Sequence, residues 1–131
     1  MTRKVKRGQI IVPGGVHPWQ HEMKVAQLLA DAGYNVEFMP EQNLLKTADF
    51  KINGIEFELK SPEGSKLSSV ERNLRRAIKQ SSNIVFDTSR MVGLQDSKIL
   101  SCILHHASKQ SLIKRLIFLD KHGRIKIFTF K

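Results

Sequence analysis

A single dipeptide, Asn53-Gly54, constrains the fold of this chain more than any other feature of its sequence. It stands at the centre of the segment 48–60, in which apolar and polar residues alternate strictly on both sides of the dipeptide. Asn-Gly between two alternating runs is the strongest short-range signal for a β-hairpin with a two-residue turn. Because both turn residues are then identified, the register of the hairpin follows from the sequence.

The register places four pairs of residues opposite one another: Ile52 and Ile55, Lys51 and Glu56, Phe50 and Phe57, and Asp49 and Glu58. Because successive side chains of a strand point to opposite faces, one face of the hairpin should be apolar and the other polar. The predicted apolar face consists of Phe50, Ile52, Ile55, Phe57 and Leu59, and the polar face of Asp49, Lys51, Glu56, Glu58 and Lys60.

The polar face indicates a site for a hard divalent cation. Two carboxylates directly opposite each other, as Asp49 and Glu58 should be, have Cβ atoms about 5 Å apart and repel unless a cation lies between them. Mg²⁺ is usually held by one or two carboxylates, with water at its other positions. Lys60 lies one pleat beyond Glu58, where it could orient a water molecule or stabilise phosphate charge. The alternative is a solvated face whose charges, such as Lys51 and Glu56, simply pair.

A helix before the hairpin offers a third acid. Helical periodicity begins near Pro18, which suits the first helical position, and ends at Gly33, which suits the position after a helix. Its predicted buried stripe is Val25, Leu28, Leu29 and Ala32. Extending this stripe backwards reaches His21 and Glu22, so Glu22 should point along the core-facing side of the helix. The alternative is that Glu22 compensates the helix dipole while partly solvated.

A second helix follows the hairpin and carries a basic row. Ser68-Ser-Val-Glu71 predicts a capping box at its start, and its predicted buried stripe is Val70, Leu74, Ala77 and Ile78. The opposite face presents Arg72, Arg75, Arg76 and Lys79 at spacings of three, four and seven residues. Such a row suits binding to phosphates, although a solvated helix face can look the same.

The remaining segments complete an α/β (α+β) fold. They are a strand at 35–39 ended by Pro40, a loop through Lys46, a strand at 83–87, a helix marked by Ile99, Leu100, Ile103, Leu104 and Ala107, and a closing hairpin of 112–119 and 124–130. The order α-β-β-β-α-β followed by α-β-β predicts a three-layer core with a mixed central sheet, in which a parallel crossover follows the third strand. We expect a basic, mobile arm over residues 1–15 and one domain over 16–131.

Charge and composition narrow the class of partner. The chain has 131 residues and a formal net charge of +10, from 22 Lys and Arg against 12 Asp and Glu, which favours nucleic acid as the partner. No apolar run approaches the roughly 20 residues that cross a bilayer, and no secretory signal is present, so we expect a soluble, cytoplasmic protein without membrane partners. The single cysteine, Cys102, excludes an intramolecular disulfide and a multi-cysteine zinc site, and is interpreted as a small core residue.

The histidines and the tryptophan are weaker candidates. His17 and His21 are four residues apart near Glu22 and could hold zinc or act as acid and base, with His21 as the better candidate. His105, His106 and His122 have no partner spacing and are expected at the surface. Trp19 could stack on a base, but an aromatic residue at a helix start more often anchors the helix on the core.

The order of elements, with Asp49, eight intervening residues and then Glu58-Leu-Lys60, resembles the PD-(D/E)XK nuclease superfamily. This resemblance implies that Glu22, Asp49 and Glu58 bind metal, that Lys60 assists hydrolysis and that Gln80 supports the site. The residue before the first acid is usually Pro in that superfamily and is Ala48 here.

More narrowly, the chain is similar to the C-terminal toxin domains of bacterial contact-dependent growth inhibition proteins, several of which cut tRNA and others DNA. The residues that carry this similarity are His21-Glu22, Gly33–Pro40, Ala48-Asp49, Glu58–Pro62, and Gln80 before Ile84-Val-Phe86. It covers roughly His17 to Arg90 and implies delivery to the cytoplasm of a target cell and a cognate immunity protein.

Three functions therefore stay open. The first is a metal-dependent nuclease that uses Mg²⁺ or Mn²⁺, with Zn²⁺ as a further option, and that cleaves tRNA or, alternatively, DNA. The second is a non-catalytic nucleic-acid-binding protein that uses the basic helix. The third is a protein-interaction module whose positive charge meets an acidic partner.

Overall fold

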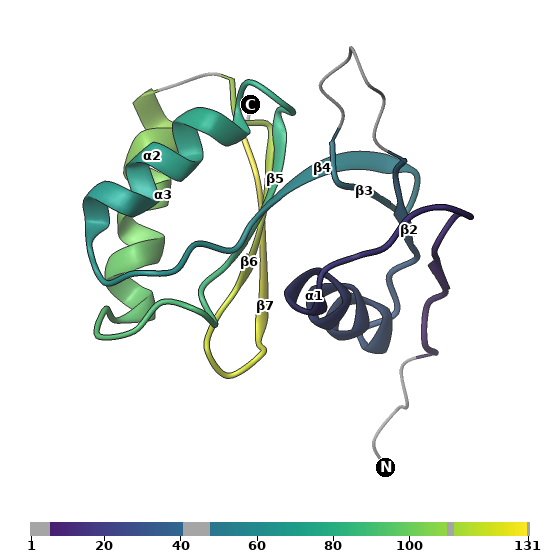
Figure 1. Cartoon of the computed structure of the whole chain (residues 1–131). Helices are drawn as coiled ribbons and strands as arrows, with labels where there is room; N and C mark the ends of the chain where they lie inside the picture. Colours follow the sequence, from purple (N-terminus) through teal and green to yellow (C-terminus); the bar gives the residue numbers. More distant parts are fainter. Residues whose placement is uncertain (1–5, 41–47, 110–111, 131) are drawn as a thin grey trace. The chain divides into compact units, whose positions relative to one another are not determined.

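The computed structural model describes residues 6–40, 48–109 and 112–130, so residues 1–5 of the expected arm and most of the loop through Lys46 lie outside the described residues. The elements, in chain order, are β1 (Ile10–Ile11), α1 (Gln20–Asp31), β2 (Val36–Phe38), β3 (Phe50–Ile52), β4 (Ile55–Lys60), α2 (Leu67–Ala77), β5 (Asn83–Asp87), α3 (Asp96–Lys109), β6 (Arg115–Leu119) and β7 (Ile125–Thr129) (Figure 1). The chain forms two compact units, Met1–Phe57 and Glu58–Lys131.

The hairpin of the N-terminal unit has the predicted turn. Strands β3 and β4 are antiparallel, with the pairs Phe50–Phe57, Lys51–Glu56 and Ile52–Ile55. Asn53 and Gly54 have φ angles of 50° and 83°, the two positive values that the turn needs and that Asn and Gly tolerate best. The Asn53 side chain also accepts a hydrogen bond from the Asn35 N–H at 2.8 Å, which ties the turn to the start of β2.

The predicted register ends at Phe50. Asp49 N–H donates to the carbonyl oxygen of Phe57 at 3.1 Å, so Asp49 and Phe50 both oppose Phe57, which is the pattern of a β-bulge. The prediction that Asp49 and Glu58 form a regular cross-strand pair is therefore wrong. Alternation in the sequence could not reveal this extra residue in the strand, because a bulge depends on how the chain enters the ladder.

Helix α1 packs beside β1 and β2, and its buried face differs from the predicted stripe. Val25, Ala26, Leu29 and Ala30 are buried, whereas Ala32 is exposed and Leu28 is half-buried. The helix also begins at Gln20 rather than near Pro18, because Trp19 has extended backbone angles and serves as the N-cap. Gly33 has a φ of 100° and its N–H donates to the carbonyl of Ala30, as expected for a residue after a helix end.

Part of the segment assigned to an N-terminal arm joins the sheet of this unit. Strand β1 pairs in parallel with β2, Ile10 lying opposite Val36. Gly8 N–H donates to the carbonyl of Ala30 at 2.8 Å, and a Cβ at Gly8 would lie 1.9 Å from the carbonyl oxygen of Tyr34. Only glycine can make this close approach.

The C-terminal unit is built on the second half of β4, which pairs in parallel with β5, followed by β6 in parallel and β7 antiparallel. The hydrogen-bonded strand order β1 to β7 confirms the expected mixed sheet, and both the parallel crossover and the closing hairpin are as predicted. Helices α2 and α3 lie side by side against this unit's strands (Figure 1). Their shared core comprises Val70, Leu74, Ala77, Ile84, Phe86, Met91, Ile99, Ile103, Ala107, Ile113, Leu116 and Phe118.

The capping box predicted for the second helix is not formed. Helix α2 begins at Leu67, its N-cap is Lys66, and no side chain caps it, so Glu71 lies in the second turn rather than at the third position. The buried stripe Val70, Leu74 and Ala77 is confirmed, and Ile78 is half-buried. Among the described helices, none has the length and apolar character that would let it span a bilayer.

Candidate metal and nucleic-acid site

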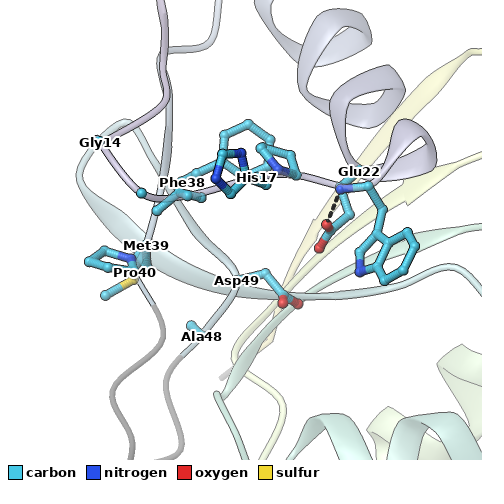
Figure 2. Close-up of a pocket in the computed structure, with 12 residues that line it drawn as sticks. Gly14, His17, Glu22, Phe38, Met39, Pro40, Ala48 and Asp49 are labelled. Carbon is cyan, nitrogen blue, oxygen red and sulfur yellow. Dashed lines mark hydrogen bonds between the residues drawn. The ribbon is translucent and has the colours of Figure 1, made fainter.

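The N-terminal unit contains a cavity of about 490 Å³. Its wall is formed by the loop 14–19, Glu22 of α1, residues 38–40 at the end of β2, and residues 48–49 before β3. Glu22 and Asp49 both line this cavity, Glu22 from the start of α1 and Asp49 from the segment before β3 (Figure 2). Two residues that the sequence analysis selected for metal binding are thus brought together within one unit.

Glu22 is placed by the local structure of the helix start. It is the third residue of α1, and its Oε1 accepts the Trp19 N–H at 2.7 Å. This is half of a capping box, because the indole ring of Trp19 has no oxygen that could accept a hydrogen bond in return. Glu22 Oε2 accepts no hydrogen bond from the described residues, and Glu22 is half-buried rather than turned into the core. The sequence therefore placed Glu22 correctly at the start of a helix. Its hydrogen bond to Trp19 and its place at the cavity wall both depend on the loop before the helix.

Asp49 is held by its backbone on both sides. Its N–H donates to Phe57 of β4 at 3.1 Å, and its carbonyl oxygen accepts the Met39 N–H at 3.0 Å. Bulges often re-aim a side chain next to a functional site. Here the bulge lies at Asp49 itself, and the half-buried Asp49 lines the cavity.

Glu58 and Lys60 belong to the second half of β4, in the C-terminal unit. The Glu58 side chain is buried, with 7% of the residue exposed, and its Oε2 lies 3.4 Å from Lys60 Nζ. A buried carboxylate needs a cation or hydrogen-bond donors nearby. Lys60 supplies the positive charge, and the pair lies at successive positions of one face of the strand, as the sequence predicted.

Gln80, expected to support the site, has an unusual environment. Its backbone N–H donates to the carbonyl of Ala77 just beyond α2. Its side-chain oxygen Oε1 is buried and has no hydrogen-bond partner among the described residues. Burying an acceptor without a donor costs roughly 1–3 kcal/mol of folding free energy. A water or a substrate group that donates a hydrogen bond to Gln80 Oε1 would recover this energy.

The histidines are arranged differently from the sequence expectation. His17 precedes α1, so it shares no helix face with His21, and the i, i+4 zinc pair does not form on the helix. His17, not His21, lines the cavity, although His21 stands beside Glu22 on α1. Trp19 is 72% exposed at the cavity wall and does not anchor the helix on the core. A side chain that is this open can stack on a base.

The basic row on α2 is solvent-exposed as predicted. Arg72, Arg75, Arg76 and Lys79 all lie on the outer face of the helix or directly after it. None of the four forms an ion pair with an acidic residue in the described parts of the chain. Their charges are therefore available to a polyanion.

One cluster escaped the sequence analysis. Glu71 of α2 lies close to Cys102 and His106 of α3. Cys102 is half-buried and packs against the hydrophobic core, in agreement with its interpretation as a small core residue, whereas His106 is half-buried rather than fully at the surface. The signal was the Cys-x-x-x-His spacing at 102–106, which places both side chains on one face of a predicted helix. Its partner Glu71 comes from another helix, which sequence spacing could not reveal.

Comparison with known proteins places the chain in a family. No curated protein sequence matches it. A toxin and immunity complex, "CdiA-CT/CdiI", from Burkholderia pseudomallei has a similar fold, with a TM-score of 0.71, 21% sequence identity, and coverage of 94% of this chain and 100% of that one. The family model of the contact-dependent growth inhibition CdiA C-terminal domain matches residues 46–125, which is more than half of the chain. The chain therefore belongs to the family of CdiA C-terminal domains of contact-dependent growth inhibition.

Proposed function

We propose that this domain is a metal-dependent nuclease toxin of the PD-(D/E)XK type, with tRNA as its favoured substrate and DNA as the alternative. The observation that carries the proposal is the convergence of the Glu22 and Asp49 carboxylates on one cavity (Figure 2). Family membership supports it, because CdiA C-terminal domains generally act as nuclease toxins. The preference for tRNA rests on resemblance.

The donor set fits a hard divalent ion. Glu22 and Asp49 offer carboxylate oxygens at the cavity, and the resemblance adds that of Glu58. Such oxygens suit Mg²⁺ or Mn²⁺, whereas Zn²⁺ is better matched by nitrogen and sulfur donors. Such an ion would polarise the phosphate and lower the pKa of a bound water. The orphaned Oε1 of Gln80 adds a buried acceptor for a water or substrate group.

The chain's own residues have separate tasks in this proposal. Glu22 and Asp49 would hold the metal at the cavity, and the resemblance to the PD-(D/E)XK superfamily assigns Glu58 as a further ligand. Lys60, with Nζ 3.4 Å from Glu58, stabilises negative charge that develops on the phosphate or orients the attacking water. The exposed Trp19 and the basic row on α2 bind the nucleic acid.

The test is cleavage of tRNA, total RNA and plasmid DNA by the purified domain in Mg²⁺, Mn²⁺ or Zn²⁺, with and without chelator. We expect metal-dependent cleavage that falls at least about 100-fold in Glu58→Gln and in Lys60→Ala. Glu56→Gln and Lys51→Ala are matched controls, since this pair lies on the same hairpin and should leave cleavage intact. Cleavage of none of the substrates in any of the metals would overturn the proposal.

A non-catalytic nucleic-acid binder is the second candidate, favoured by the unpaired basic row. Replacing Arg75 and Arg76 by Ala should weaken binding and reduce the salt dependence of log K, by about 0.7–0.9 for each phosphate that the variant no longer neutralises. Binding that survives Glu58→Gln, in a protein that never cleaves, would establish this function instead.

We also propose that an acidic immunity protein inhibits this domain. The net charge of +10 suits an acidic partner, and the structurally similar chain comes from a toxin and immunity complex. Co-expression with a small acidic protein encoded beside the toxin should give a complex in which cleavage is blocked. Cleavage that continues in the purified complex would rule out inhibition by that protein.

A further inference from the structure

Three side chains with metal-binding atoms meet between α2 and α3, in the C-terminal unit. Glu71 comes from α2, and Cys102 and His106 stand one turn apart on α3. A carboxylate oxygen, the Cys102 Sγ and an imidazole nitrogen all lie within 4.8 Å of one another. None of these residues belongs to the proposed nuclease site.

These distances are close to those of a coordinated metal. With bonds of about 2.3 Å to sulfur and 2.0–2.2 Å to nitrogen or oxygen, the ligand atoms of a tetrahedral Zn²⁺ lie roughly 3.3–3.7 Å apart. His106 Nε2 and Glu71 Oε1 are already 3.6 Å apart. The remaining adjustment is on the order of 1 Å, and the Glu71 side chain, which is 43% exposed, has room to make it.

We propose that Glu71, Cys102 and His106 form a zinc-binding site that links α2 to α3. A thiolate, an imidazole and a carboxylate together favour Zn²⁺ over Mg²⁺, since thiolate is a soft ligand that Mg²⁺ avoids. Three protein ligands leave a fourth position for water. The site would fix α2, whose outer face carries the basic row, against α3.

The surroundings of Cys102 agree with this role. Cys102 also lines a groove of about 600 Å³, together with Leu67, Ser97, Lys98, Ser101 and His105. Cys102 is therefore not enclosed by the core on every side.

Cobalt absorption tests the site directly, because Cys102 is the only cysteine of the chain. The whole domain, freed of metal by chelation and kept reduced with a phosphine, is titrated with Co²⁺. We expect thiolate-to-cobalt charge-transfer absorption and visible bands of tetrahedral Co²⁺ at one ion per chain, both displaced by Zn²⁺. The absence of the charge-transfer band would overturn the proposal, as would saturation at one ion per two chains, which would indicate thiolates from two copies.

Variants separate this site from neighbouring groups. Cys102→Ser should abolish the charge-transfer band, and His106→Gln should weaken Co²⁺ and Zn²⁺ binding by at least about 10-fold while a residual band remains. His105→Gln is the matched control, because His105 is adjacent on α3 but outside the cluster, and it should bind as the wild type does. Equal binding by His106→Gln and His105→Gln would refute the assignment.

Thermal unfolding gives a readout that is independent of absorption and of nuclease activity. Zn²⁺ should raise the Tm of the wild type above that in chelator, and by more than it raises the Tm of Cys102→Ser. Circular dichroism in chelator shows whether each variant folds. An equal Zn²⁺-induced shift in both proteins would contradict the site. The Asp49→Asn variant should keep the band, so failure of the proposed nuclease and failure of this zinc site can be told apart.

Discussion

Carboxylates in the two units of the chain are held in different ways. In the C-terminal unit, Asp87 is 2% exposed and accepts hydrogen bonds from Ser61 Oγ at 2.7 Å, Ser89 Oγ at 2.9 Å and Ser89 N–H at 3.0 Å. Glu22 in the N-terminal unit accepts one hydrogen bond and borders an open cavity together with Asp49.

The difference separates structural acids from candidate functional acids. A carboxylate whose oxygens are saturated by protein donors stabilises the fold and has little left to offer a ligand. A carboxylate that borders a cavity together with a second one adds repulsion to the fold and gains most when a cation binds. Removing the first kind should cost stability, and removing the second kind should cost activity.

The largest expected effect concerns the cavity acids. Asp49→Asn and Glu22→Gln should each lower the cleavage rate at least about 100-fold, because each removes a charged ligand of the metal. The free energy of unfolding of Glu22→Gln should stay within about 0.5 kcal/mol of the wild type, since Gln can still accept the Trp19 N–H. Cleavage assays and urea unfolding of the same preparations measure both. Full activity in Asp49→Asn would show that this cavity acid of the N-terminal unit is not a functional one.

The second effect concerns Asp87. Asp87→Ala should lower the free energy of unfolding by about 2–4 kcal/mol, because it removes three hydrogen bonds to a buried charge. Glu37→Ala is the control, since Glu37 is exposed at the middle of β2. Urea unfolding measures stability, and the cleavage rate per folded molecule should not change. A lost rate with unchanged stability would move Asp87 into the functional class.

The smallest effect is a pH dependence at Asp96. Burial raises the pKa of Asp96, but hydrogen bonds from Thr88 and from the backbone and side chain of Lys121 outweigh it, so the pKa is lowered overall. A carboxylate whose folded pKa is depressed contributes stability that is present above its unfolded pKa, near 4, and is lost as the pH falls through the folded pKa.

Asp96→Asn should therefore reduce stability at pH 7 by on the order of 1 kcal/mol at most, because solvent screens this partly exposed group. The difference from the wild type should shrink as the pH falls below about 4. Unfolding midpoints in urea at several pH values measure it. A difference that stays constant from pH 7 to pH 3 would show that the charge of Asp96 does not contribute.

The sequence was sufficient wherever one local interaction decides the structure. Asn53-Gly54 determined the turn and three cross-strand pairs, and the 3.6-residue period located the stripe Val70, Leu74 and Ala77. It was insufficient at element ends. Helix α1 begins at Gln20 rather than near Pro18, and α2 begins without the predicted capping box. The residue at which a helix begins depends on small energy differences between backbone conformations in the adjoining loop.

For the candidate sites, sequence alone selected Glu22, Asp49, Glu58 and Lys60 and placed Glu58 and Lys60 on one face of a strand, since alternation along a strand is a local property. Only the tertiary structure decided that Asp49, at a bulge, lines one cavity together with Glu22, and that Glu71 of one helix meets Cys102 and His106 of another. Both results depend on contacts between residues far apart in the chain, and the periodicity of one segment carries no information about which partner packs against it.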